Sequence, residues 1–304
     1  MRNILYILLL SAFSLNAQYS CNQVQPQNLG DTVLIFIKDG QSNSVGQMAA
    51  KNGGLTVTPN EYKYTQDSIR INYEGTYLTY DSSITHFPAM KVNTNTSDQS
   101  YTNPASAGYN IGNWSVEQSC LRQIPTIIGQ KIYFIQNGIG AIDIRQWNSP
   151  SGLQWIKLKR YIKHLSDSLI VLGKVPKFVS LAWQQGESDI LNNQLNWYGT
   201  RLKTLITNVR AINQYTDSIQ FVLFRMKYPS TNGSYPNDSV AKLNASIDSV
   251  AGVTFRCESI NTNSQTMYSY PHYDVLGMIN MGYLWFAELY PLIVYRKVKI
   301  INYK

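Results

Sequence analysis

Charged side chains are scarce in this chain: they make up 14% of its 304 residues, whereas hydrophobic residues make up 44%. This balance excludes an intrinsically disordered chain, which combines low hydrophobicity with a high net charge. The formal charge of +8 comes from basic residues that are spread along the sequence rather than gathered in a stripe. Because no recognisable nucleic-acid-binding module accompanies them, we expect no nucleic-acid partner.

Cysteine is also scarce, with only Cys21, Cys120 and Cys257 in the chain. Their spacing matches no zinc-site pattern, so no metal site is expected. In an oxidising compartment Cys120 and Cys257 would either pair in a disulfide or lie buried separately as small apolar side chains. The sequence leaves both alternatives open.

Beyond the N-terminus, no apolar run is long enough to cross a membrane. Residues 1–17 have the layout of a secretory signal peptide: Arg2 comes first, an apolar run from Ile4 to Phe13 follows, and Ala17 ends a stretch with small residues. Cys21 raises the alternative of a lipoprotein, but the residues before it lack the usual aliphatic side chain three positions upstream. We expect an exported protein without membrane insertion, whether periplasmic, surface-attached or released.

Short β-type segments alternate with longer helical patterns along the rest of the chain. This alternation predicts an α/β fold, a single three-layer α/β/α domain over residues 28–300 with a parallel sheet of about five strands. Residues of about 51–109, rich in Asn, Thr, Ser and Tyr, are expected to form a loop-rich insertion with a small hairpin. The strands are expected at 32–38, 131–136, 177–183, 219–224 and 253–257, and the helices at 116–128, 152–172, 196–212, 240–250 and 279–298.

Polar blocks follow three of these strands. The first strand leads into Gly-Gln-Ser-Asn (40–43), where Gly40 can turn the chain and deliver Ser42 to the carboxyl edge of the sheet, the edge at which open α/β folds bind ligands. The second leads to a glycine-containing loop that ends at Trp147, and the third leads to Gln-Gln-Gly-Glu-Ser-Asp (184–189). His272 lies before the last helix at the same edge, whereas His86 and His164 are expected in a loop and on a solvated helix face.

These residue types are the parts of acyl transfer. A serine hydroxyl is a weak nucleophile until a base takes its proton, and an imidazole is the usual base. A carboxylate normally holds the other imidazole nitrogen in the required tautomer, and N–H donors stabilise the developing oxyanion. The pattern therefore predicts a serine carboxylic ester hydrolase.

The Gly-Gln-Ser-Asn block, the glycine-then-tryptophan block and the Gln-Gly-Glu-Ser-Asp block resemble those of SGNH-type hydrolases. More narrowly, they resemble the sialate O-acetylesterase-like and acetylxylan esterase group, the sixth carbohydrate esterase family, over roughly Thr32 to Leu292. The resemblance implies a flavodoxin-like sheet and a secreted carbohydrate O-acetylesterase. Such an enzyme removes acetyl groups from a polysaccharide or from sialic acid and needs no cofactor.

The resemblance also implies roles for single residues. The family commonly has an aspartate three residues before its histidine, but this chain has Ser269 there, so Glu187 is the predicted acid and Asp274 its alternative. Weaker expectations of substrate contact concern Gln41, Asn43, Arg145, Trp147 and Asp189. The catalytic residues are then Ser42 as nucleophile, His272 as base and Glu187 as acid, with Ser42, Gly140 and Gln185 forming the oxyanion hole.

Ser269 also motivates a second hypothesis, a glycan-binding protein that keeps the esterase scaffold but turns over weakly or not at all. Contact between Glu187 and His272 would favour the enzyme. The natural sugar, the position of the acetyl group and the oligomeric state are not determined by the sequence.

Overall fold

The structure, a computed structural model of the chain, describes residues 31–44, 46, 65–72, 89–91, 115–121, 124–129, 132–230 and 234–301. The predicted signal peptide at 1–17, Cys21, His86 and most of the predicted insertion lie outside the described residues.

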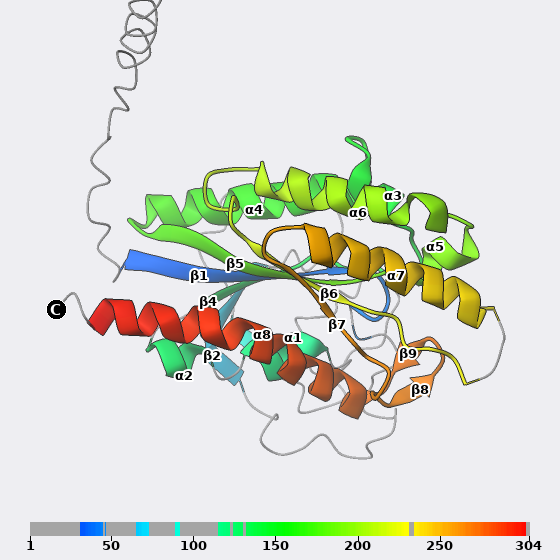
Figure 1. The fold of residues 1–304 in the computed structure, drawn as a ribbon. Helices are drawn as coiled ribbons and strands as arrows, with labels where there is room; N and C mark the ends of the chain where they lie inside the picture. Colours follow the sequence, from blue (N-terminus) through cyan, green and yellow to red (C-terminus); the bar gives the residue numbers. More distant parts are fainter. Residues whose placement is uncertain are drawn as a thin grey trace, which may run out of the picture.

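The centre of the main sheet is β1 (Thr32–Gly40), which pairs in parallel with β4 (Ile132–Gln136) on one side and β5 (Val175–Gln184) on the other. Beyond β5 lie β6 (Gln220–Phe224) and β7 (Cys257–Ile260), also parallel (Figure 1). The order β4-β1-β5-β6-β7 is the flavodoxin-like one, in which the second strand along the chain lies outside the first. The predicted α/β fold is thereby confirmed.

Two further strands come from within the predicted insertion. β2 (Thr65–Asn72) pairs in parallel with β4, and β3 (Ala89–Lys91) pairs antiparallel with β2. They extend the main sheet to seven strands in the order β3-β2-β4-β1-β5-β6-β7. The prediction of about five strands therefore missed the β2–β3 edge, because the polar composition of this segment resembles that of a loop.

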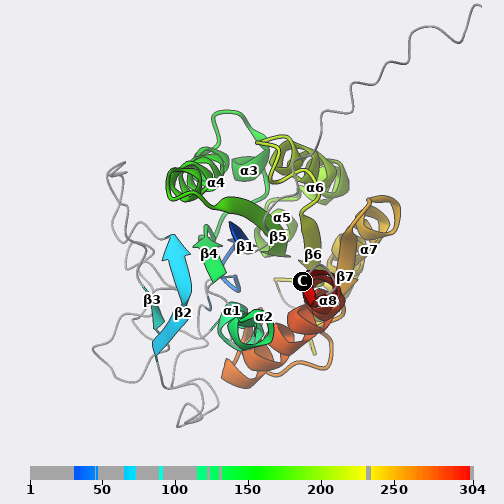
Figure 2. The ribbon, with the colours of Figure 1, turned by 90° about the vertical axis from the view of Figure 1, so that its left-hand side faces the viewer.

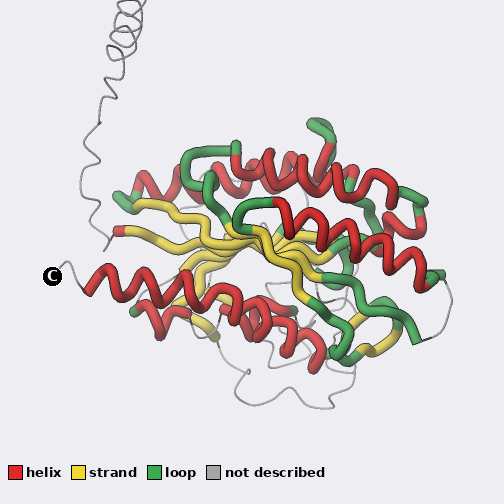
Figure 3. Tube along the Cα trace, viewed as in Figure 1, coloured by secondary structure: helices red, strands yellow, loops and turns green. Residues whose placement is uncertain are grey.

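Both faces of β1 are buried. Leu34 and Phe36 belong to one apolar cluster, and the alternate residues Ile35 and Ile37 belong to the other. A strand that is covered on both faces reads as a continuous apolar run, which is why the sequence predicts it well. The sheet separates the two clusters, and the helices form a layer on each side of it (Figures 2 and 3).

The first cluster lies under α4, α6 and α7, and the second lies under α1, α2 and α8. Predicted residues 116–128 form two helices rather than one, because Pro125 has no N–H to donate and its ring clashes with a preceding carbonyl. The last predicted strand, 253–257, begins only at Cys257, because α7 continues to Val253. The helices are α1 (Val116–Cys120), α2 (Ile124–Ile128), α3 (Arg145–Asn148), α4 (Leu153–Val171), α5 (Glu187–Leu191), α6 (Leu195–Arg210), α7 (Asn237–Val253) and α8 (Val275–Ile301).

Three side chains bear on the sequence predictions for the core. Cys120 and Cys257 are both free and buried, and they lie in different apolar clusters. His164 is buried on α4, so the expectation of a solvated helix face is wrong for it. Among the described helices, none is both long enough and apolar enough to span a membrane.

Candidate active site

Ser42 lies just past the carboxyl end of β1, where Gly40 brings the chain against β5. Gly40 has φ +133°, and a Cβ atom there would lie 2.1 Å from the carbonyl oxygen of Gln184. The N–H of Gln41 donates to that same carbonyl oxygen at 2.9 Å. A residue with a side chain could adopt neither this φ nor this approach, so glycine is required immediately before the site.

His272 is the partner of Ser42. It lies on β9 (His272–Tyr273), which forms a small antiparallel sheet with β8 (Met267–Ser269) next to the start of α8. The His272 Nε2 and Ser42 Oγ atoms are 3.0 Å apart, a hydrogen-bond distance. Burial lowers the pKa of His272 below its ordinary value, so the ring is neutral and able to accept a proton at neutral pH. The structure thus brings together two residues that are 230 positions apart in the sequence.

Glu187 is buried at the start of α5, but it contacts Asn43 rather than His272. Asn43 Nδ2 donates to Glu187 Oε1 at 2.6 Å. Within the described residues, the only hydrogen bond of the His272 ring is the one with Ser42. Burial raises the pKa of Glu187, and the bond from Asn43 opposes this rise. The predicted acid therefore hydrogen-bonds to Asn43 and not to the histidine.

Asp274, the alternative acid, caps a helix instead. Its Oδ1 accepts from the N–H of Gly277 at 2.7 Å and from the hydroxyl of Thr266 at 2.5 Å. A carboxylate that accepts the free N–H groups of a first helical turn is a common way to begin a helix. Asp274 thus serves the start of α8 and makes no hydrogen bond to His272.

Two backbone N–H groups in the loops after β1 and β4 lack a backbone acceptor within the described residues. Within the described residues, neither the N–H of Ser42 nor that of Gly140 donates to a backbone carbonyl. Ser42 is buried, and Gly140 is half-buried in the loop after β4, next to Ala141 with φ +62°. N–H groups without an internal acceptor at a strand edge are suitable donors for an oxyanion.

The side-chain amide of Gln185, in contrast, has no unused N–H donor. Its Nε2 lies 2.5 Å from Asp189 Oδ2, 3.1 Å from Gln41 Oε1 and 3.3 Å from the carbonyl oxygen of Ile142. An amide nitrogen has only two hydrogens, so these acceptors already exceed its capacity. The predicted role of Gln185 in the oxyanion hole is therefore not supported: its amide supports the loops around Ser42.

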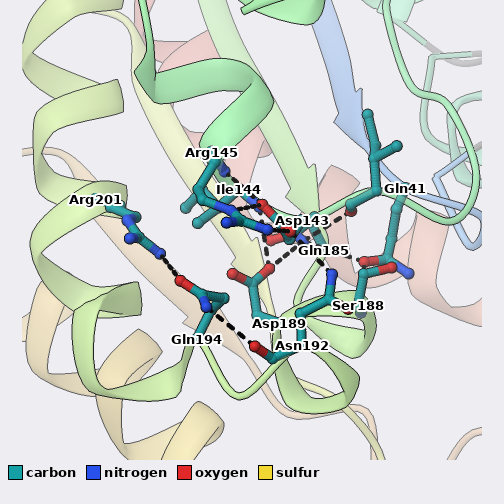
Figure 4. A network of polar contacts seen from close by, with 11 residues as sticks. Gln41, Asp143, Ile144, Arg145, Gln185, Ser188, Asp189, Asn192, Gln194 and Arg201 are labelled. Carbon is teal, nitrogen blue, oxygen red and sulfur yellow. Dashed lines mark hydrogen bonds and ion pairs between the residues drawn. The ribbon is translucent and has the colours of Figure 1, made fainter.

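Gln41 and Asp189 belong to the same buried polar network (Figure 4). Gln41 Oε1 also accepts from the N–H of Ser188 at 3.1 Å, and Asp189 Oδ2 accepts from the N–H of Ile144 at 3.1 Å. Burial raises the pKa of Asp189 to about 6. The side chains of Gln41 and Asp189, which were expected to contact substrate, thus make hydrogen bonds that join the three site loops.

Arg145 lies at the outer side of this network, with its side chain 54% exposed. Its Nε and one terminal nitrogen bind both carboxylate oxygens of Asp143, at 2.8 and 2.6 Å. Asn192 Nδ2 donates to the same carboxylate at 2.9 Å. This bidentate pairing holds the pKa of Asp143 low. Of the residues expected to touch substrate, Arg145 is the one that reaches solvent most freely.

Trp147 is a core residue, so the expectation that it contacts substrate is wrong. Its ring is fully buried, packs edge-on against Trp183 with centroids 5.1 Å apart, and donates its N–H to Asp39 Oδ1 at 2.9 Å. Asp39 also accepts from Asn137 Nδ2 at 2.9 Å, and burial raises its pKa to about 7. Sequence reasoning missed this buried carboxylate, although its place directly before Gly40 was a signal.

Within the described ranges, no three His, Cys, Asp or Glu side chains gather in a way that could hold a metal ion. The polar contacts around Ser42 are the Ser42–His272 pair, the Asn43–Glu187 pair and the network around Gln41.

The family model described as "Carbohydrate esterase, sialic acid-specific acetylesterase" matches residues 32–284, most of the chain. The chain belongs to this family. The resemblance seen in the motifs is thereby confirmed, and the family is one of carbohydrate esterases. The comparison with curated proteins found no match.

Several solved structures share the fold of this family member at low sequence identity. A protein from Arabidopsis thaliana superposes with a TM-score of 0.61 at 13% identity, covering 84% of this chain and 97% of that one. XAC1771, described as a novel carbohydrate acetylesterase from Xanthomonas citri, gives 0.53 at 12%, covering 84% of this chain but only 55% of its own. NanS gives 0.51 at 11%, covering 78% and 79%. These likenesses support the fold.

Proposed function

We propose that this protein is a serine-dependent carbohydrate O-acetylesterase in which Ser42 is the nucleophile and His272 the general base. The observation that carries the proposal is the 3.0 Å distance between Ser42 Oγ and His272 Nε2. The lowered pKa of His272 supports it, because a base must be unprotonated to act at neutral pH. Membership of a carbohydrate esterase family supplies the substrate class.

In the first half of the reaction, His272 Nε2 takes the proton of Ser42 as Oγ attacks the acetyl carbonyl carbon. The carbonyl electrons move onto oxygen, and the N–H groups of Ser42 and Gly140 donate to this oxyanion. When the intermediate collapses, the sugar oxygen leaves and takes the proton from His272. The acetyl group remains on Ser42 as an ester.

In the second half, water replaces the sugar. His272 takes a proton from the water as its oxygen attacks the acetyl carbon, and the same N–H groups hold the second oxyanion. Collapse returns the proton to Ser42 Oγ and releases acetic acid, which loses its remaining proton to solvent and becomes acetate. No cofactor takes part in the proposal.

The proposed substrate is an acetylated carbohydrate, either an acetylated polysaccharide such as xylan or an O-acetylated sialic acid. The partly exposed guanidinium of Arg145 favours a test of an acidic sugar, although its pairing with Asp143 already uses one face. The proposal includes export after cleavage behind Ala17, which the N-terminal mass of protein recovered from outside the cytoplasm would test.

The deciding experiment measures acetate release from p-nitrophenyl acetate, acetylated xylan and 9-O-acetyl sialic acid. We expect Ser42→Ala to lower kcat by at least about 10³-fold on every substrate that the wild type cleaves, since loss of the nucleophile removes the covalent route. Ser44→Ala is the matched control, because its buried hydroxyl has no hydrogen-bond partner within the described residues. Equal rates for Ser42→Ala and Ser44→Ala would refute the proposal.

One observation favours the second candidate, a glycan-binding protein without turnover: no carboxylate among the described residues hydrogen-bonds to the His272 ring. A serine–histidine pair can nevertheless act without one, because much of the rate enhancement comes from the oxyanion hole and from binding. If the wild type releases no acetate from any of the three esters but binds an acetylated glycan in calorimetry, this second function replaces the first.

A further inference from the structure

Asn43, the residue after the proposed nucleophile, uses both ends of its amide. Its Nδ2 donates to the carbonyl oxygen of Pro271 at 2.9 Å and to Glu187 Oε1 at 2.6 Å. Its Oδ1 accepts from the N–H of Tyr273 at 3.3 Å. The side chain is buried, so these bonds have no competition from water. Asn43 therefore hydrogen-bonds to the main chain on both sides of His272.

The same stretch of chain is tied to the rest of the fold in a different way. The hydroxyl of Tyr270 donates to the carbonyl oxygen of Lys227 at 2.9 Å, and the N–H of Lys227 donates to the hydroxyl of Tyr273 at 3.2 Å. These two bonds fix the His272 segment to the chain that follows β6. Within the described residues, the hydrogen bonds that join the main chain of this segment to the end of β1 are those of Asn43, which is one residue from Ser42.

Glu187, the carbonyl of Pro271 and the N–H of Tyr273 together fix which way the Asn43 amide faces. An amide can be turned over with little change in shape, and only its hydrogen-bond partners select the orientation. A carboxylate accepts and cannot donate, so Glu187 Oε1 requires the nitrogen of Asn43 on its side. That orientation places the same nitrogen on the carbonyl of Pro271 and the oxygen on the N–H of Tyr273.

We propose that Asn43 is a positioning residue that sets the distance between His272 and Ser42, and that Glu187 acts through Asn43 rather than on the imidazole. The proposal deepens the proposed function and rests on it, because the position of His272 has a catalytic meaning only if Ser42 reacts. In place of the predicted Ser42–His272–Glu187 triad, the catalytic unit is then a Ser42–His272 pair. The amide of Asn43, together with the carboxylate of Glu187, maintains the geometry of this pair. A misplacement of about 1 Å is enough to cost about 10²-fold in rate.

The proposal and a conventional triad predict different effects of Glu187→Gln. The glutamine oxygen still accepts from Asn43, so we expect kcat to fall by no more than about 10-fold, with the acidic midpoint of the pH profile unchanged. An acid that is hydrogen-bonded to the imidazole would give a loss of about 10⁴-fold. It would also move the midpoint to lower pH, because the imidazolium would lose its stabilising charge.

Asn43→Asp tests whether the hydrogen bonds of Asn43 position His272. It places two carboxylates against each other and removes the donor to Pro271, so we expect kcat to fall by about 10²-fold or more while KM changes little. Adding Glu187→Gln to this variant restores a donor between positions 187 and 43, since the glutamine nitrogen can donate to the aspartate. We expect the double variant to recover about 10-fold of the lost rate.

Asn244→Asp is the matched control. Asn244 is also buried and also holds both backbone groups of one residue, Met226, at 2.9 and 2.8 Å, but it contacts neither Ser42 nor His272. We expect it to lower the melting temperature and to leave kcat within about 3-fold of wild type. A loss of rate in Asn43→Asp without a comparable loss in this control then reports geometry, not unfolding.

Each variant is assayed with p-nitrophenyl acetate across pH, and the rate at which a fluorophosphonate modifies Ser42 is followed by mass spectrometry. The labelling reports an activated serine without needing an acetyl ester. If the wild type hydrolyses no ester, the proposed function fails. The labelling rates of the variants then test by themselves whether Asn43 positions His272 against Ser42. A loss of about 10⁴-fold in Glu187→Gln, or a double variant no faster than Asn43→Asp, overturns the inference in either assay.

Discussion

At the scale of single residues, the base and the buried carboxylates are distinguished by what surrounds them. His272 is partly buried and its ring meets a hydroxyl, whereas Asp39, Glu187 and Asp189 are buried and accept N–H groups. Burial disfavours the charged form in each case, so the pKa of the histidine falls and those of the carboxyls rise.

The pH dependence of activity follows from the position of His272. Because the pKa of the imidazole lies below its ordinary value of 6.5, the basic form persists at lower pH. We expect kcat/KM for p-nitrophenyl acetate to rise with pH and to reach half its maximum below pH 6.5. The proton resonance of the His272 ring, identified by its absence in His272→Ala, should titrate with the same midpoint. A midpoint well above pH 6.5 would mean that a negative charge stabilises the imidazolium.

At the scale of elements, the strands that are buried on both faces were predictable and the segments at the rim were not. β1 carries one unbroken apolar run, and its pattern alone identifies it. β2 and β3 lie at the edge of the sheet within a polar segment, where a strand gains its stability from its neighbour rather than from its own composition. α3 and α5 have only four and five residues, too few for a helical period to be visible.

The packing of α8 on α1 gives a prediction about one glycine. A Cβ atom at Gly282 would lie 2.3 Å from the carbonyl oxygen of Val116 and 1.9 Å from the hydroxyl of Ser119. The main chain of α1 cannot yield as a flexible side chain would, so we expect Gly282→Ala to lower the free energy of unfolding by about 1–3 kcal/mol. Chemical denaturation measures this directly.

Gly252 in α7 is the control for that substitution. A Cβ atom there meets nothing within 4 Å, so Gly252→Ala should raise the free energy of unfolding by about 0.5–1 kcal/mol through helix propensity. If both variants changed stability by the same amount and in the same direction, close contact between α8 and α1 would not be the reason that glycine occupies position 282.

At the scale of the whole molecule, one sheet lies between two apolar clusters and contributes side chains to both. Cys120 lies in the cluster under α1, α2 and α8, and Cys257 lies in the cluster under α4, α6 and α7. Both thiols are buried, and burial raises the pKa of Cys257 to about 12 and that of Cys120 well above its ordinary value. Neither is reactive in the folded protein, because the thiolate is the reacting form.

These two thiols therefore report whether the clusters unfold together. In a Cys21→Ser background, we expect a disulfide reagent such as Ellman's to label both at one rate, equal to the rate of global unfolding, because β1, β4, β5, β6 and β7 each contribute side chains to both clusters. Single Cys120→Ser and Cys257→Ser variants separate the signals. Labelling of one cysteine many times faster than the other would show that one helical layer opens independently.

The sequence by itself determined the fold class, four of the five central strands (β1, β4, β5 and β6) and the residues that meet at the sheet edge. These depend on local signals: apolar runs, glycines at strand ends, and polar blocks that follow them. Only the tertiary structure decided which partner each side chain finds. Glu187 faces Asn43, Asp274 faces the first turn of α8, Gln185 faces Asp189, and Trp147 fills the core. The reason is physical: a hydrogen bond depends on positions to a few tenths of an ångström, and these are set by packing among segments far apart in the chain.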